Sequence, residues 1–423
     1  MTTPQEVLGE PITFPFSGKT AKNRFLKSAM SERLATFSTF DPYDRGRPTE
    51  ELARAYETWS NGNIGILVTG NIQVKKDHLE ATGNAIIDNE LPDYIEDFRR
   101  IAQGARTNGS LILGQLCHPG RQVPININPY PESASDVELV SVGGIEFGRP
   151  IPLARDGIKD IVDRFAYAAS VLHQAGFDGV QVQGGHGYLI NQFLSKRTNR
   201  RTDEYGGSLL NRSRLLFDVL QAIKSTVKDS GFMISVKLNA DDFVPGGFSA
   251  DEAVQVARAL EQRGVDLIEL SGGTYEHVPE MHKHKRAIPA DQEAYFINYA
   301  KKLRSNPGLR RSKIVLTGGF RSATAMAIAV AEGHTDLVGM ARPFAAEPFL
   351  ALDILKGLKT GAKGDKFTPG QWLRLAAAGH QIAEIGNGVD VTDFDNFFEV
   401  SRFVAKMQGE IPEMMAEALS SDI

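Results

Sequence analysis

The chain has 423 residues, of which 42% are hydrophobic, so it is long and apolar enough for a large core and for two or three domains. Its net charge of -5 argues against binding to nucleic acid, and no apolar run approaches the roughly 20 residues of a membrane span. The single cysteine, Cys117, excludes an intrachain disulfide and a Cys-based metal site, and the N-terminus lacks a signal peptide, so we expect a cytoplasmic protein.

Strand-like and helix-like segments alternate along most of the chain. Residues 1–23 predict a short hairpin or cap. Candidate strands then lie at residues 24–30, 64–69, 111–116, 179–183, 233–238, 267–270, 314–316 and 337–340, separated by segments with apolar residues at helical spacing. Eight such units predict a parallel sheet closed into a (β/α)8 TIM barrel. An open, doubly wound sheet is the alternative, but its usual G-x-G-x-x-G motif is absent from the first turn.

Two segments lie outside this repeating pattern. Residues 119–154, after the third strand, are rich in Pro and Gly and predict an excursion that contains a hairpin. Residues 361–423 follow the last unit and carry apolar residues such as Trp372 and Phe403, which predict helices. We therefore expect a barrel domain over residues 1–360 and a helical extension over 361–423, packed on the barrel or on a neighbouring subunit of a homodimer.

The end of the fourth strand carries a cluster of chemically different side chains. Gln183, His186 and Tyr188 stand within six residues of one another, around Gly184 and Gly185. Active sites of parallel barrels lie at the carboxyl ends of the strands. A glycine-rich turn with one hydrogen-bonded His and one packed Tyr is the alternative. The cluster and the long polar loop after it favour a site.

The ends of the seventh and eighth strands have the composition of a phosphate site. Gly318 and Gly319 follow the seventh strand, and Ala341 and Arg342 follow the eighth. Loops at these two positions bind phosphate in many barrels, through backbone N–H groups and a cation with paired donors. Two tight turns and a surface Arg are the alternative interpretation, which explains less of the pattern.

Longer motifs resemble one known family. The runs HGYLINQFLS and NRRTDEYGGSLLNR are similar to those of the Old Yellow Enzyme family of FMN-dependent ene-reductases. The segments NRFLKSAM, VTGN, GQLCHPGRQ, VKLNADDF, TGGF and DLVGMARPF also resemble that family at matching strands, so the resemblance spans residues 20–350.

The resemblance implies a tightly but non-covalently bound FMN. Its isoalloxazine ring would be bordered by residues from the first two strand ends, namely Ala29, Met30, Ser31 and Gly70. Gln115 would bond the pyrimidine edge, and Lys237 would lie near N1 and O2. A cation there would stabilise the reduced anion. The phosphate would lie against Gly318, Gly319, Ala341 and Arg342.

The resemblance also implies a reaction. NADPH or NADH would reduce FMN, and an activated alkene such as an α,β-unsaturated carbonyl compound would then take hydride from N5. Tyr188 would protonate the other alkene carbon. Gln183 and His186 would hold the substrate oxygen, and Tyr275 would line the pocket.

One departure from the family pattern leaves alternatives open. Most members carry His-x-x-His or His-x-x-Asn where this chain has Gln183 to His186, and a glutamine cannot become cationic. Two alternative functions therefore stay open. One is a flavin-dependent oxidase or dehydrogenase with other substrates, and the other is a flavin barrel without turnover. No metal site is expected: the run HVPEMHKH, residues 277–284, is interpreted as a solvated lid.

Overall fold

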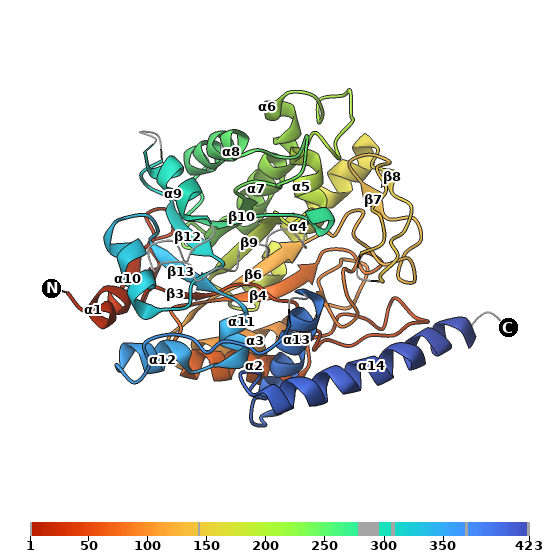
Figure 1. Cartoon of the computed structure of the whole chain (residues 1–423). Coiled ribbons are helices and arrows are strands. Elements are labelled where there is room, and N and C mark those ends of the chain that lie inside the picture. The colour runs from red at the N-terminus through yellow and green to blue at the C-terminus, as the bar shows by residue number, and fades with distance from the viewer. Residues whose placement is uncertain (1, 143, 278–295, 306–308, 369–370, 421–423) are drawn as a thin grey trace.

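Parallel strands close into a barrel in the computed structural model, which describes all residues except 1, 143, 278–295, 306–308, 369–370 and 421–423 (Figure 1). Within the described residues the ring contains β3 (Phe25–Lys27), β4 (Ile66–Gln73), β6 (Leu111–Cys117), β9 (Gly179–Gly184), β10 (Met233–Asn239), β11 (Leu267–Ser271), β12 (Lys313–Thr317) and β13 (Leu337–Met340). β3 pairs in parallel with both β13 and β4, so the sheet has no free edge in the ring. The predicted (β/α)8 barrel is confirmed.

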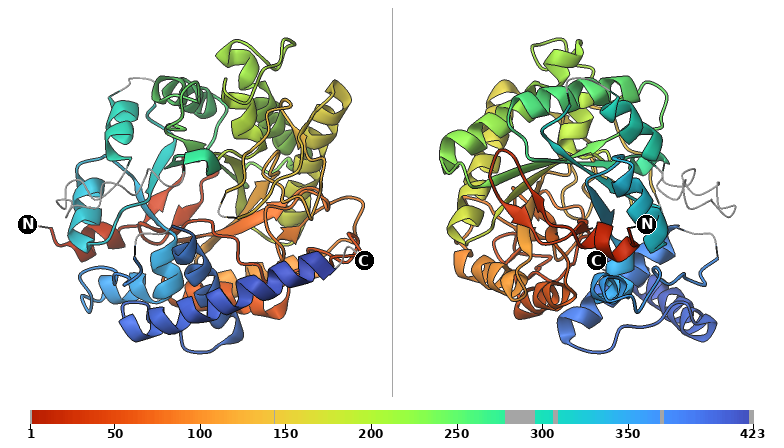
Figure 2. Two further views of the ribbon diagram at one scale, coloured as in Figure 1. Left: turned by 45° about the vertical axis from the view of Figure 1, so that its right-hand side comes forward. Right: turned by 90° about the vertical axis from the view of Figure 1, so that its left-hand side faces the viewer.

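Helices surround this ring (Figure 2). They are α2 (Glu50–Asn61), α3 (Ile95–Arg106), α4 (Arg155–Gln174), α5 (Leu189–Leu194), α6 (Leu209–Arg212), α7 (Arg214–Val227), α8 (Ala250–Gln262), α9 (Ile297–Arg304), α10 (Ala323–Ala331), α11 (Arg342–Ala346) and α12 (Leu350–Leu355). Local sequence sets their starts. The Thr49 side chain accepts a hydrogen bond from the Leu52 N–H, and Ser249 with Glu252 forms a capping box at α8.

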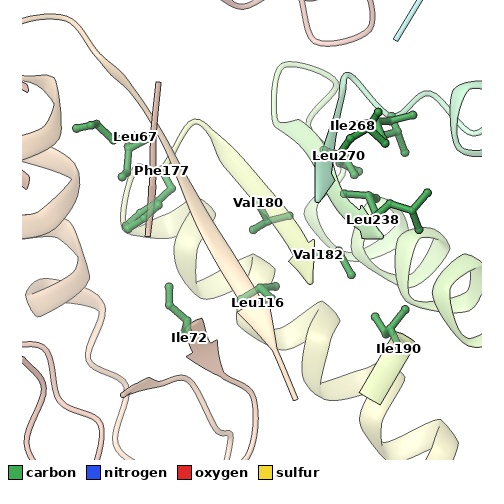
Figure 3. Packing of buried hydrophobic residues seen from close by; sticks show 14 of the residues in the cluster. Leu67, Ile72, Leu116, Phe177, Val180, Val182, Ile190, Leu238, Ile268 and Leu270 are labelled. Carbon is green, nitrogen blue, oxygen red and sulfur yellow. The ribbon is translucent and has the colours of Figure 1, made fainter. Parts of the chain in front are cut away.

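The two faces of each strand have different surroundings. Val180 and Val182 of β9 pack outward with Leu238 and Ile268 in the core between strands and helices (Figure 3). Burial of each such side chain contributes roughly 1.5–3 kcal/mol. The alternate residue Gln181 faces its polar neighbours on the adjoining strands instead, because successive side chains of a strand point to opposite faces. This alternation gives the barrel a polar interior near its carboxyl end.

A hairpin lies across one end of the barrel, as predicted for residues 1–23 (Figure 2, right). It consists of β1 (Ile12–Thr13) and β2 (Thr20–Ala21), after a short helix α1 (Pro4–Gly9). Phe14 is fully buried in a second apolar cluster built from the amino-terminal parts of the barrel strands. The Asp266 carboxylate accepts hydrogen bonds from the backbone N–H groups of Phe16 and Ser17, at 3.0 and 3.1 Å, which fixes the hairpin on the barrel.

The excursion after β6 contains little regular structure. β7 (Glu132–Ser133) and β8 (Ile151–Pro152) pair in parallel. Earlier in the chain, in the loop between β4 and α3, β5 (Ala85–Ile86) pairs in parallel with the end of β4. The hairpin expected in the excursion is reduced to isolated antiparallel bridges, such as the one between Val142 and Ile145. The backbone groups of the excursion bond mainly to one another across the segment, as from the Ile125 N–H to the Glu146 carbonyl at 2.9 Å and from the Gly148 N–H to the Val123 carbonyl at 3.1 Å. These irregular pairings have no alternating pattern that the sequence could show.

Helices α13 (Gln371–Asn387) and α14 (Phe397–Ser420) follow the barrel. α13 packs against α2 and α11, and Arg54 donates a 2.7 Å hydrogen bond to the Gly386 carbonyl. In Figure 1, α14 runs beside α13 along the lower edge of the molecule. None of the described helices is both long enough and apolar enough to cross a membrane. Apart from His277, the expected lid at 277–284 lies outside the described residues.

Candidate active site

An ion pair lies inside the barrel near the carboxyl ends of the strands. Lys237 of β10 and Glu269 of β11 are both buried, with Nζ 3.0 Å from Oε1. Glu269 also accepts hydrogen bonds of 2.8 to 2.9 Å from Ser28, Thr317 and Gln181. Burial alone would raise the pKa of Glu269, but the Lys237 cation and these donors outweigh burial and lower that pKa. Glu269 is therefore ionised and has satisfied partners.

Three glutamines continue this polar network toward the mouth. Gln115 donates to the Gln181 side-chain oxygen at 2.6 Å, and Gln183 donates to the Gln115 oxygen at 3.4 Å. The Gln183 oxygen accepts a hydrogen bond from the Gly185 N–H at 3.1 Å. The network thus fixes which end of each amide faces its neighbours, and Gln183 is held by the turn that follows its own strand.

His186 is held in an unusual backbone conformation after β9. Its φ is 56°, in the left-handed region that is uncommon for residues other than glycine. Asn239 accepts a hydrogen bond from the His186 N–H at 3.0 Å, and the ring Nε2 lies 2.6 Å from the Ser271 hydroxyl. Burial, and then the nearby Lys237 cation, lower the pKa of His186 to about 3. The imidazole is therefore neutral at physiological pH.

Two phenols meet beside this histidine. The hydroxyl oxygens of Tyr188 and Tyr275 lie 3.2 Å apart, and the Asn71 amide donates to Tyr188 at 3.4 Å. Burial, and then the Glu80 carboxylate, raise the pKa values of both phenols above their ordinary value. Both phenols are therefore protonated at neutral pH, and Tyr188 has a proton available.

The predicted flavin-bordering residues of the first two strands lie side by side. The Glu32 carboxylate accepts hydrogen bonds from the Gly70 N–H, at 2.8 Å, and from the Tyr56 hydroxyl. A Cβ atom on Gly70 would lie 2.1 Å from Glu32 Oε2 and 2.3 Å from the Met30 carbonyl. Only glycine fits there, so Gly70 holds the Ala29–Ser31 loop directly against the end of β4.

The ends of β12 and β13 also come together as predicted. Gly318 and Gly319 have φ values of 113° and 96°, and Gly339 pairs with Thr317 just before Ala341. Arg342 begins α11 and lines a cavity of about 80 Å³. Arg321, Lys363 and Arg374 also line this cavity, together with two carboxylates: Asp365 pairs with Arg374 at 2.8 Å and Asp393 with Lys363 at 2.7 Å. Gly318, Gly319 and Ala341 are not among its lining residues, so it is the bare backbone of the two strand ends, with Arg342, that suits an anionic group such as a phosphate.

The structure also shows a buried cluster that the sequence did not reveal, formed by His78, His118 and Glu132. His118 Nδ1 accepts the Gly120 N–H at 3.1 Å, so its Nε2 carries the proton and faces Glu132 Oε2 at 3.6 Å. His78 Nε2 accepts the backbone N–H of Glu132 at 2.9 Å. Neither ring offers a free lone pair toward the carboxylate. This cluster fastens the excursion to the barrel and does not suit a metal ion.

Comparison with known proteins agrees with this geometry. The sequence profile of the NADH:flavin oxidoreductase / NADH oxidase family matches residues 8–361. The chain belongs to this family. The family includes Old Yellow Enzyme relatives, so the fold, the FMN cofactor and NAD(P)H as reductant all follow from membership. The protein is an FMN-dependent oxidoreductase.

Individual relatives support the same family assignment. The NADH-dependent flavin oxidoreductase nadA of Aspergillus parasiticus is 42% identical over 95% of this chain and 90% of its own length. An Old Yellow Enzyme homologue from Zymomonas mobilis has a TM-score of 0.70 at 24% identity, covering 84% and 94% of the two chains. A 2-naphthoyl-CoA reductase has a TM-score of 0.76 at 21% identity, over 94% of this chain but only 58% of its own. At such identities the structures support the fold alone.

The donor set at the barrel mouth fits FMN. Gly70 leaves no room for a side chain at the predicted ring edge, and Lys237 is a buried cation near the strand ends. Gln115 already bonds to Gln181 and Gln183, so binding the pyrimidine edge would require it to exchange one of these partners. The individual roles predicted for these residues stay predictions.

Proposed function

We propose that this oxidoreductase reduces the activated C=C bond of α,β-unsaturated carbonyl compounds, with Tyr188 as the proton donor. One observation carries the proposal: a protonated phenol stands beside two neutral groups, Gln183 and His186, at the end of one barrel strand. FMN, when bound and reduced by NAD(P)H, would supply hydride to the alkene, and side chains of this chain would hold the substrate and supply the proton.

Tyr188 would deliver the proton to the alkene carbon next to the activating group. The hydroxyl oxygens of Tyr188 and Tyr275 lie 3.2 Å apart, and the raised pKa of Tyr188 keeps its hydroxyl protonated at neutral pH. A positioned acid of this kind typically contributes about 10²–10⁴-fold in rate. Tyr275 would orient the Tyr188 hydroxyl and line the pocket, because it is the nearest described hydroxyl partner.

Gln183 and His186 would hold the substrate oxygen. Both groups are neutral, so the oxygen gains hydrogen bonds but no full positive charge. Polarisation of the alkene is then modest. Substrates whose alkene is already strongly electron-poor, such as maleimides with two carbonyl groups, should therefore react faster than simple enones.

We propose the following FMN contacts from the same geometry. The ring would lie against Ala29, Met30, Ser31 and Gly70, with Gln115 at its pyrimidine edge and Lys237 near N1 and O2. The phosphate would be held by Gly318, Gly319, Ala341 and Arg342. The positive φ values of Gly318 and Gly319 and the position of Arg342 at the start of α11 support this assignment.

We also propose a division of the chain into an FMN-binding barrel, residues 1–360, and a C-terminal extension, residues 361–423. The packing of α13 on α2 supports an extension that docks within its own chain. Arg374 of α13 lines the same cavity as Arg342 and pairs with Asp365 at 2.8 Å, so the extension also contacts the part of the barrel that carries Arg342. A homodimer formed through the remaining surface is a separate prediction, which sedimentation would test.

The function is tested by anaerobic half-reactions of the FMN-loaded enzyme. Addition of NADH or NADPH should bleach the flavin absorbance, and maleimide or cyclohexenone should then restore it. Bleaching without recovery by any activated alkene would favour a dehydrogenase or oxidase with other substrates. A failure to bind FMN would favour a barrel without turnover.

A further inference from the structure

A carboxylate stands beside the two phenols. Glu80 Oε1 accepts hydrogen bonds from the Ser31 hydroxyl, from Asn71 at 3.3 Å and from Asn84 at 3.0 Å. Its other oxygen, Oε2, accepts no hydrogen bond from the described residues. The Asn71 amide links this carboxylate to the Tyr188 hydroxyl, because its Nδ2 donates to both. In agreement with this geometry, the Glu80 charge raises the pKa values of both Tyr188 and Tyr275, second only to burial.

A second acceptor lies between Glu80 and Tyr188. The Asn71 side chain is 7% exposed and donates its Nδ2 to both the Tyr188 hydroxyl and Glu80 Oε1. Its orientation follows from Glu80, because a carboxylate requires the NH2 end of the amide. The remaining oxygen, Asn71 Oδ1, is buried without a partner among the described residues. Buried polar atoms are rarely left unpaired, so this oxygen is available to a ligand.

Few nearby cations oppose this negative site. His186 is neutral, and Lys237 is already paired with Glu269. Arg33 exerts a small effect on the Tyr275 pKa but is an exposed side chain, so solvent screens it. The half-buried Glu80 carboxylate is screened less than an exposed charge. The substrate side of Tyr188 therefore offers hydrogen-bond acceptors and a net negative charge.

We propose that Glu80 and Asn71 form a subsite for a protonated amine, so that the preferred substrates are activated alkenes that carry a cationic ammonium group. This inference rests on the proposed alkene reduction and adds its substrate class. An ammonium group has three donors and a positive charge. It would match Glu80 Oε2 and Asn71 Oδ1 while the alkene lies next to Tyr188.

A matched pair of substrates tests the subsite. N-(2-aminoethyl)maleimide and N-propylmaleimide have side chains of similar size, but only the first is cationic at pH 6.5. The wild-type enzyme should show at least a tenfold higher kcat/KM for the cationic compound. In Glu80→Gln, which removes the charge and keeps the shape, this ratio should fall to within about threefold of unity. The exposed Glu57→Gln control should keep the wild-type ratio.

A second measurement needs no variant. Titration of the oxidised wild-type enzyme with 4-(2-aminoethyl)phenol and 4-propylphenol, followed in the flavin spectrum, should give at least tenfold tighter binding of the ammonium compound. Equal binding, or an equal kcat/KM ratio in wild type and Glu80→Gln, would overturn the subsite. If neither maleimide reoxidises the flavin, alkene reduction itself fails, while the phenol titration still decides the ammonium subsite.

Discussion

Lys237 and Glu269 form an ion pair in the barrel interior, with 3.0 Å between Nζ and Oε1. The lysine stands where the family resemblance places the N1 and O2 edge of FMN. The carboxylate therefore compensates the cation that would stabilise the reduced flavin. Because both residues are buried and hydrogen-bonded, neither side chain can turn to solvent when its partner is removed.

Replacement of Glu269 by glutamine should be strongly destabilising. The variant leaves the buried Lys237 ammonium without its counter-charge, which typically costs about 3–5 kcal/mol. Urea unfolding of wild type and Glu269→Gln measures this loss in the free energy of unfolding. Asp251→Asn, which breaks the exposed pair with Lys302, should change it by under ~1 kcal/mol. Equal stability of Glu269→Gln and wild type would mean that Lys237 does not depend on this carboxylate.

Replacement of Tyr188 by phenylalanine should separate the two half-reactions. Flavin bleaching by NADH or NADPH should continue at the wild-type rate, since it needs no proton from this phenol. Reoxidation by an enone should slow about 10²–10⁴-fold, as expected for loss of a general acid. Stopped-flow absorbance measures both steps. As a control, Tyr205→Phe removes a phenol that is bonded to Asp218, away from the site, and should leave both rates unchanged. If Tyr188→Phe slowed flavin reduction and flavin reoxidation equally, the acid role of Tyr188 would be contradicted.

The reoxidation rate should be independent of pH between 5.5 and 9. The raised pKa of Tyr188 keeps the acid protonated over this range, and the His186 pKa of about 3 keeps the imidazole neutral. A single-turnover pH profile with maleimide measures this. A sigmoidal change centred near 6.5 would show that His186 titrates at its ordinary value.

The lowered pKa of His186 should also make the stability of the fold depend on pH. The unfolded chain takes up a proton on His186 near pH 6.5, whereas the folded chain does so only near pH 3. The free energy of unfolding should therefore fall as pH decreases from 6.5 toward 3. His186→Gln should lessen the fall over this window, as measured by urea unfolding at each pH.

Replacement of Gln183 by histidine should tighten the binding of phenols. A second imidazole can become cationic and would stabilise a bound phenolate, which the neutral amide cannot do. Spectral titration of the flavin with a simple phenol measures the dissociation constant. Gln183→Asn, which shortens the amide and adds no charge, is the matched control. Unchanged phenol affinity in Gln183→His would show that residue 183 does not face the ligand.

Replacement of Gly70 by alanine should damage the flavin site. The added Cβ would meet Glu32 and the Met30 carbonyl at distances that require the loop to move. Such overpacking typically costs about 1–3 kcal/mol and should weaken FMN binding, which flavin fluorescence measures. Gly379→Ala, with open space at its Cβ, should bind FMN as wild type does.

The sequence predicted the barrel because apolar strands and amphipathic helices alternate along the chain with a clear period. It also placed the groups at the strand ends, since the order of the strands decides which ends meet. Glu269 and Glu80 were not singled out, because their importance comes from partners on other strands and loops. The excursion was also less predictable: its short pairings and the His78, His118 and Glu132 cluster depend on tertiary contacts that leave no periodic signal.

Among the described residues, the hairpin that carries Phe14 fills the amino-terminal end of the barrel with apolar side chains. The predicted flavin contacts lie at the opposite end, so we expect both the reductant and the substrate to approach the flavin there. The reductant and the oxidising substrate must then occupy one place in turn. Steady-state kinetics should accordingly follow a substituted-enzyme pattern, with parallel double-reciprocal lines and mutual competitive inhibition at high concentration.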